Sequence, residues 1–129
     1  MKRRTAREKS LQALYQMDMS GAEPMEAIEN VLEGTSPDDY LQACVTGTAE
    51  HLQEIDEIIK KHLEKWSFDR LAKVDRNILR LAVYEMMYVD DVPQNVAINE
   101  AIELSKLFSE ERSGKFINGV LSRIKESLN

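Results

Sequence analysis

Residues 74–89 read VDRNILRLAVYEMMYV and form the most apolar stretch of the chain. It is apolar on most sides rather than along one stripe, which is typical of a central helix contacted by several others. The sequence DDVP at 90–93 then breaks the helix. We therefore expect residues 74–89 to form a central helix, with the other elements of the fold packed around it.

Outside this stretch the pattern is also helical nearly throughout, with no convincing strand. Apolar residues recur at helical spacing in five further segments, at residues 5–20, 24–34, 37–66, 96–108 and 113–128. Ser113 is predicted to cap the last helix, and Gly119 within it is expected to allow close approach of a neighbouring helix. The predicted fold class is all-α, in one domain spanning residues 1–129 with a division near residue 67.

The segment before residue 67 is predicted to be one long helix. Ser36 is a suitable N-cap, Pro37 suits a first turn, and Asp38 and Asp39 suit the positive end of the helix dipole. Apolar residues then recur at alternating steps of four and three as far as Trp66, which predicts a stripe of about seven turns.

Composition excludes several classes of protein. Glycine (5) and proline (3) are scarce, which argues against a turn-rich β architecture. A single cysteine can form neither an internal disulfide nor a zinc site. No signal peptide and no apolar run of transmembrane length is apparent. We expect a cytoplasmic protein with no membrane contact.

Charge is distributed unevenly along the chain. The net charge of −6, taken as a whole, argues against a nucleic-acid partner. However, residues 1–9 carry five basic residues and one acid, whereas residues 10–59 contain eleven acids and no Lys or Arg. The total therefore conceals a positive N-terminus beside an acidic block.

No constellation of residues suggests catalysis. His51 and His62 are eleven residues apart, or about 16 Å along a helix, and cannot share one metal. Cys44 has no basic neighbours in sequence, and we expect it in the core. There is no HExxH motif and no glycine-rich phosphate loop. We expect no enzyme activity, metal, cofactor or small-molecule substrate.

The basic N-terminus is the first candidate binding site. On a helix, Arg3 and Arg7 lie one turn apart with Arg4 beside them, and such positive charge is unfavourable at a helix start. An anionic partner such as nucleic acid would offset this cost. A solvated or frayed tail, or a contact with the acidic block of the same chain, explains the cluster equally well.

The second candidate site is SGKFIN at 113–118. A helix N-terminus together with Lys115 can hold a phosphate, and Phe116 can stack on a base, a combination that single-stranded RNA favours. Taken alone, Phe116 is explained more simply by core packing, and Asn118 by an ordinary exposed position.

Four segments together resemble the NusB family of transcription antitermination factors. They are RRTAREKSLQALYQMD at 3–18, VDRNILRLAVYEM at 74–86, DVPQNVAINEAIELSKLF at 91–108 and SGKFINGVLSRI at 113–124. The resemblance implies two three-helix subdomains packed as one compact domain. It also implies binding to the boxA RNA of ribosomal RNA leader transcripts together with the ribosomal protein NusE, within an RNA polymerase antitermination complex that promotes readthrough and rRNA synthesis.

Carried over by position, the resemblance implies two groups of site residues. The RNA-binding group matches Lys2, Arg3, Arg4, Arg7, Ser113, Lys115, Phe116 and Asn118. Arg112 joins it as a cation where several relatives carry an acid. The NusE-facing group matches Asp75, Arg76, Arg80 and Glu85. We expect Arg7 to be exposed, so that Arg7→Ala weakens RNA binding with little loss of helicity.

Two other functions remain open at this point. A related helical module is the RNA-binding part of an rRNA cytosine methyltransferase, but this chain has no glycine-rich cofactor loop and we expect no methylation from it. The other possibility is a helical protein–protein adaptor without direct RNA binding. In that case Asp75 is an N-cap and Arg76 a surface charge.

Overall fold

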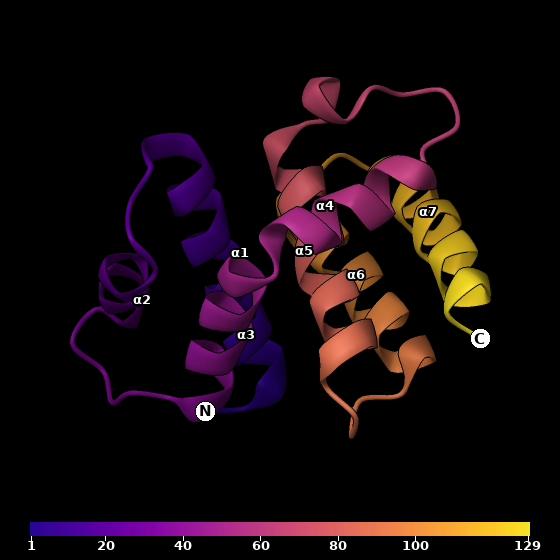
Figure 1. Cartoon of the computed structure of the whole chain (residues 1–129). Helices are drawn as coiled ribbons and strands as arrows, with labels where there is room; N and C mark the ends of the chain where they lie inside the picture. Colours follow the sequence, from indigo (N-terminus) through magenta and orange to yellow (C-terminus); the bar gives the residue numbers. More distant parts are fainter.

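The computed structural model describes residues 1–129 and is all-α, as predicted, with no strand (Figure 1). Its elements are α1 (Arg3–Ser20), α2 (Pro24–Leu32), α3 (Asp39–Glu50), α4 (Leu52–Lys61), the 3-10 turn η1 (Phe68–Arg70), α5 (Lys73–Tyr88), α6 (Gln94–Phe108) and α7 (Ser113–Leu128). None of these helices is long and apolar enough to cross a membrane.

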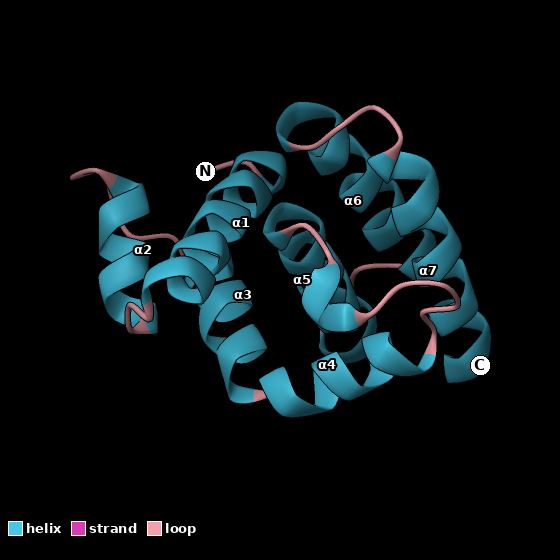
Figure 2. Cartoon of the chain, turned by 90° about the horizontal axis from the view of Figure 1, so that it is seen from above, coloured by secondary structure: helices cyan, strands magenta, loops and turns pink.

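Helix α5 lies at the centre, which confirms the prediction from its sequence. It contacts α1, α3, α4, α6 and α7. Every residue from Arg76 to Met86 is buried, so no side of the helix faces solvent over that length. Helices α1, α2 and α3 lie on one side of α5 and helices α6 and α7 on the other, with α4 passing along a third side (Figure 2). The buried apolar residues of both halves form one continuous core.

The prediction of a single long helix over residues 37–66 is wrong at three places. The helix begins at Asp39, because the Asp38 side chain, not that of Ser36, accepts the hydrogen bond from the Leu41 N–H. The helix bends at His51, where φ is −106° and ψ is 19°. It ends at Lys61, so Trp66 lies in the loop that follows.

The bend at His51 has a packing explanation. His51 keeps backbone hydrogen bonds to both helices, from its N–H to Gly47 and from the Ile55 N–H to its carbonyl. The bend lets α3 pack on α1 and α2, while α4 turns toward α5 and α7. The His51 ring stacks on Tyr88 of α5 with centroids 4.1 Å apart, which anchors the bend to the central helix.

The close approach of two helices occurs at Gly47, not at Gly119 as predicted. A Cβ atom on Gly47 of α3 would lie 2.3 Å from Cε1 of Tyr84 on α5. A Cβ atom on Gly119 would meet only Nη1 of Arg123, at 3.5 Å. Gly47 therefore sets the distance between α3 and α5.

Candidate nucleic-acid interface

The first two arginines of α1 form ion pairs with acids from the C-terminal half of the chain. Arg3 donates to Asp91 at 3.0 Å, and its guanidinium lies over the Tyr40 ring at 4.2 Å from the centroid. Arg4 donates to Glu100 on α6 at 3.1 Å, and its side chain is 62% exposed. The predicted alternative of a contact with the acidic block at 10–59 is therefore wrong for these two arginines, because their partners are Asp91 and Glu100. Because both arginines remain at the surface, they can exchange these partners for phosphates.

Arg7 is buried, and the prediction that it is exposed is wrong. Only 5% of the residue is accessible, and Nε donates to both carboxylate oxygens of Glu85, at 2.9 and 3.0 Å. A further bond reaches Glu100 at 3.4 Å, and Tyr40 donates to Glu85 from the other side. Burial disfavours the charged guanidinium, but the bonds to Glu85 outweigh it and raise the pKa of Arg7. Arg7 therefore joins α1 to α5 and α6, and this carboxylate shell separates it from solvent phosphates.

The residues matched to a NusE-facing surface are mostly interior as well. Arg76 and Arg80 are each 8% exposed, and Glu85 only 1%. Arg76 forms a bidentate pair with Asp18 of α1, and Arg80 with Asp56 of α4. The expected surface position is wrong for all three, because each is held by a partner on a neighbouring helix.

Asp75 is half-buried and is neither an N-cap nor a free surface charge. Its two carboxylate oxygens accept hydrogen bonds from the hydroxyls of Ser109 and Ser113, the latter at 3.0 Å. It therefore fixes the α6–α7 connection to the start of α5.

The start of α7 differs from prediction in its cap but keeps its exposed polar groups. The helix begins at Ser113 itself, whose buried hydroxyl is turned to Asp75 and caps no backbone N–H. The Arg112 side chain is 92% exposed and 3.8 Å from Glu110. Lys115 and Asn118 are exposed on the first turns, and Phe116 is half-buried. Arg112, Lys115 and Asn118 are thus available to a ligand, whereas the Ser113 hydroxyl is already bonded.

The two predicted RNA-contacting clusters lie at opposite ends of α5. The start of α1 lies by the end of α5, because Arg3 reaches Asp91, whereas the start of α7 lies by the beginning of α5 at Asp75 (Figure 1). The 16 residues of α5 put the clusters about 24 Å apart along its axis. The structure therefore does not bring them together into one patch.

Helix α6 bridges these ends and carries two grooves. One groove, between α1 and α6, is lined by Arg4, Glu100 and Lys106 among others. The other, between α6 and α7, is rich in amides, contributed by Asn95, Asn99, Asn118 and Asn129. Apart from Asn118, these amides were not predicted, because their spacing in the sequence carries no signal until α6 and α7 are packed.

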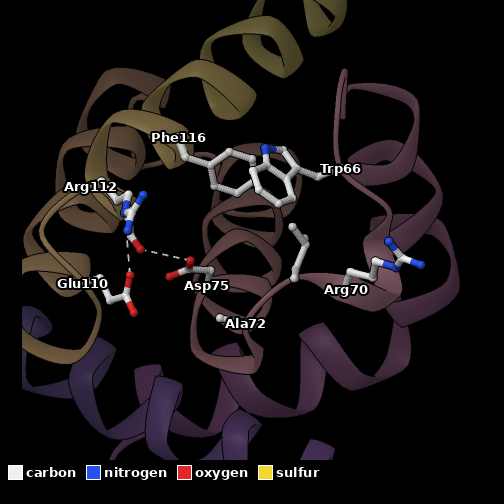
Figure 3. A pocket seen from close by; sticks show the side chains of 9 residues that line it. Trp66, Arg70, Ala72, Asp75, Glu110, Arg112 and Phe116 are labelled. Atoms are coloured by element: carbon white, nitrogen blue, oxygen red, sulfur yellow. Dashed lines mark hydrogen bonds and ion pairs between the residues drawn. The ribbon is translucent and has the colours of Figure 1, made fainter.

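Two further surface features were also missed. Trp66 and Phe116 line one cavity together with Arg70, Asp75 and Arg112 (Figure 3). Separately, the apolar groove formed by Leu11, Gln12, Tyr15, Val74 and Phe108 lies where α1, α5 and α6 meet. Tyr15 could have been recognised by its position beside the core stripe of α1; Trp66 was wrongly assigned to a helix.

The core holds the one thiol, as predicted. Cys44 is fully buried, and burial together with the nearby charge of Glu85 raises the pKa of its thiol to about 12. No group of three or more His, Cys, Asp or Glu side chains is arranged to hold a metal ion.

Comparison with known proteins identifies the family. The pattern of the NusB family matches residues 4–126. The chain is 56% identical to the transcription antitermination protein NusB of Bacillus licheniformis, over 99% of both chains. Its structure matches NusB of T. maritima with a TM-score of 0.90 and 39% identity, covering 98% of this chain and 92% of that one. It also matches a crystal structure of the antitermination factors NusB and NusE in complex with double-stranded RNA, with a TM-score of 0.88 and 36% identity, over 97% of this chain and 96% of that one. The chain belongs to the NusB family of transcription antitermination proteins.

Proposed function

We propose that this protein binds the boxA element of nascent ribosomal RNA leader transcripts together with the ribosomal protein NusE. The resulting complex joins RNA polymerase and promotes readthrough of terminators and rRNA synthesis. The chain contributes recognition and no catalytic step. A relative at 36% identity forms a complex with NusE and double-stranded RNA, which supports NusE and RNA as the classes of partner in this proposal.

The observation that carries the RNA proposal is the exposure of five cations at the two ends of α5. These are Lys2, Arg3, Arg4, Arg112 and Lys115. Arginine and lysine at such positions neutralise phosphates, and aromatic and amide side chains between them can contact unstacked bases. Arg7 is not part of this exposed surface, but its hydrogen bonds to Glu85 and Glu100 hold α1 against α5 and α6.

The distance between the two ends sets a minimum length for the RNA. At a spacing of about 3.4 Å per nucleotide along a stacked strand, a span of about 24 Å requires roughly seven nucleotides, whereas an extended strand with unstacked bases spans it with fewer. The strand passes over α6, whose flanking grooves offer Lys106 on one side and Asn99 and Asn118 on the other. A strand that stays stacked should therefore bind one end only when it is shorter than about seven nucleotides.

Salt titration tests this surface. If all five cations neutralise phosphates, log affinity for a boxA-type RNA should fall with log salt with a slope of about −3.5. The charge-reversal variant Arg4→Glu should make the slope shallower by about one phosphate, or about 0.7. A slope near zero, or equal affinity for a scrambled RNA, would contradict the proposal.

We propose that NusE docks on the apolar groove around Tyr15, Val74 and Phe108. Arg76, Arg80 and Glu85 are buried and already bonded within the chain, so they cannot supply the contact surface. The groove contains Val74, which precedes Asp75 in the sequence, and it exposes two aromatic rings, Tyr15 and Phe108. Such rings are typical anchors of protein interfaces.

Cooperation between the partners follows from charge. A net charge of −6 repels an RNA backbone, and a basic ribosomal protein beside this chain would extend its positive surface. Titration of boxA-type RNA with and without NusE should show tighter binding with it. Equal affinities for the RNA with and without NusE would refute cooperation.

The docking site has a separate test, which is capture of NusE by the Tyr15→Ser variant. Capture equal to that of the wild-type chain would refute the docking site.

One observation favours a second function, that of a protein–protein adaptor without RNA. Arg3 and Arg4 already have acidic partners within the chain, so their charges are compensated without RNA. RNA crosslinking at low and moderate salt separates the two functions. An adaptor would capture NusE normally and give no RNA crosslink in either condition.

A further inference from the structure

The cavity lined by Trp66 and Phe116 is formed by two parts of the chain that are distant in the sequence, residues 66–75 and residues 110–116. The loop after α4 and η1 contribute Trp66 and Arg70, the start of α5 contributes Asp75, and the start of α7 contributes Arg112 and Phe116 (Figure 3). Its volume is about 420 Å³, within the range of sites that bind small molecules. It is large enough to receive a flat ring system.

Trp66 has no structural role that accounts for its position. It is the only tryptophan in the chain, it lies outside every helix, and 60% of it is exposed. It makes no aromatic pair and no cation–π contact within the chain, whereas the buried Phe68 two residues later has three cations over its ring. Phe68 thus anchors this segment to the core, and Trp66 is left facing the cavity opposite Phe116.

The charges around the cavity favour a base over a phosphate. Arg70 and Arg112 are balanced by Asp75 and Glu110, so the lining has no net charge. The Asp75 carboxylate is held in place by Ser109 and Ser113, and it would repel an anion entering the cavity. Arg112 is almost fully exposed and can hold a phosphate outside, while the apolar rings offer π-faces within.

We propose that this cavity is a base-binding subsite, in which one unstacked nucleobase of a single-stranded RNA lies against Trp66 and Phe116. The proposal rests on the RNA-binding function proposed above and deepens it. The cavity shares Phe116 and Arg112 with the α7 end of that surface, so a strand held by Lys115 and Arg112 can turn one base into it. Stacking on an aromatic ring is tolerant of base identity, so this subsite adds affinity more than sequence selectivity.

Because Trp66 is the only tryptophan in the chain, its fluorescence reports on this cavity. Titration of the full chain with a twelve-nucleotide boxA-type RNA should quench Trp66 emission, and the titration midpoint should match that from anisotropy of the same RNA carrying a fluorophore. Trp66→Ala should weaken RNA binding by about 5- to 100-fold, the range expected for loss of one base–aromatic stack. Trp66→Phe, which keeps a ring, should lose no more than about threefold.

Met25→Ala is the matched control, since Met25 is an exposed apolar residue on α2, outside both proposed surfaces. It should leave RNA affinity unchanged, and circular dichroism should show all three variants folded. RNA binding with unchanged Trp66 emission and undiminished affinity of Trp66→Ala would overturn the subsite and leave the RNA-binding function standing. Absence of RNA binding by the wild-type chain would overturn both. A Trp66 response to NusE but not to RNA would overturn the subsite in favour of a protein contact.

Discussion

Replacement of Arg7 by alanine should cost about 3–5 kcal/mol of the free energy of unfolding, the range for breaking a buried ion pair. The side chains of Arg7 and Glu85 are only 6% and 2% exposed. Truncation leaves the Glu85 carboxylate buried, with the Tyr40 hydroxyl as its remaining donor. At about 0.05–0.15 kcal/mol per residue, the 129 residues have a free energy of unfolding of roughly 6–19 kcal/mol. The loss is therefore a large fraction of the total.

Urea unfolding followed by circular dichroism at 222 nm measures this loss, because helix content reports the whole fold whereas the exposed Trp66 does not. Arg4→Ala is the matched control, one helical turn away and largely exposed, and should cost under about 1 kcal/mol. Arg7→Met combined with Glu85→Gln removes both charges, so its cost should be smaller than the sum of the single changes by about 1–3 kcal/mol. If Arg7→Ala lowered the free energy of unfolding no more than Arg4→Ala does, and showed no coupling to Glu85, then Arg7 would not join α1 to α5 through a buried ion pair.

Three further predictions concern the core and its ion pairs. Gly47→Ala should lower the free energy of unfolding by about 1–3 kcal/mol, because the added Cβ would overlap Tyr84. Gly119→Ala, whose Cβ has room, should be neutral or stabilising by up to about 1 kcal/mol. Urea midpoints that shifted equally in the two variants would contradict this. Although burial opposes the charged form of Asp18, hydrogen bonds from Arg76 and Asn77 lower its pKa, so its contribution to stability is present above about pH 5 and is lost as pH falls below about 4. Urea midpoints measured from pH 7 to pH 3 should therefore fall less steeply for Asp18→Asn, and parallel curves would count against the pairing. Cys44 should react with a thiol reagent only on unfolding, since burial raises its pKa to about 12; labelling of the folded chain at the rate of a free thiol would show an open site.

The sequence predicts the helices well because their signals are local. The broad apolar surface of residues 74–89 reveals the central helix, and glycines mark the ends of the first two helices. Gly21 caps α1 with a φ of 76°, and α2 is capped by Glu33, with a φ of 51°, directly before Gly34. The bend at His51 is not predictable in this way, because an apolar stripe continues through it without interruption. The bend arises from tertiary packing, because α4 packs against α5 and α7 instead of continuing in the direction of α3.

The candidate site is harder to predict, because the exposure of a charged residue depends on which acids the fold places beside it. Arg3, Arg4 and Arg7 look alike in the sequence, yet only Arg7 is enclosed by acids that come from α5 and α6, 78 and 93 residues further along the chain. Arg76 and Arg80 likewise look like surface charges until α1 and α4 supply Asp18 and Asp56. The cations at the two ends of α5 are those members of the predicted RNA-binding group that the structure leaves exposed.

The most direct test of the central claim is the affinity of the full chain for a twelve-nucleotide boxA RNA, measured by anisotropy with NusE present, against a scrambled RNA of the same composition. We predict tighter binding of boxA than of the scrambled RNA, and a loss of affinity when Arg4→Glu and Lys115→Glu are introduced at the two ends, separately and together. Equal affinity for boxA and scrambled RNA, or binding indifferent to both charge reversals, would contradict the account.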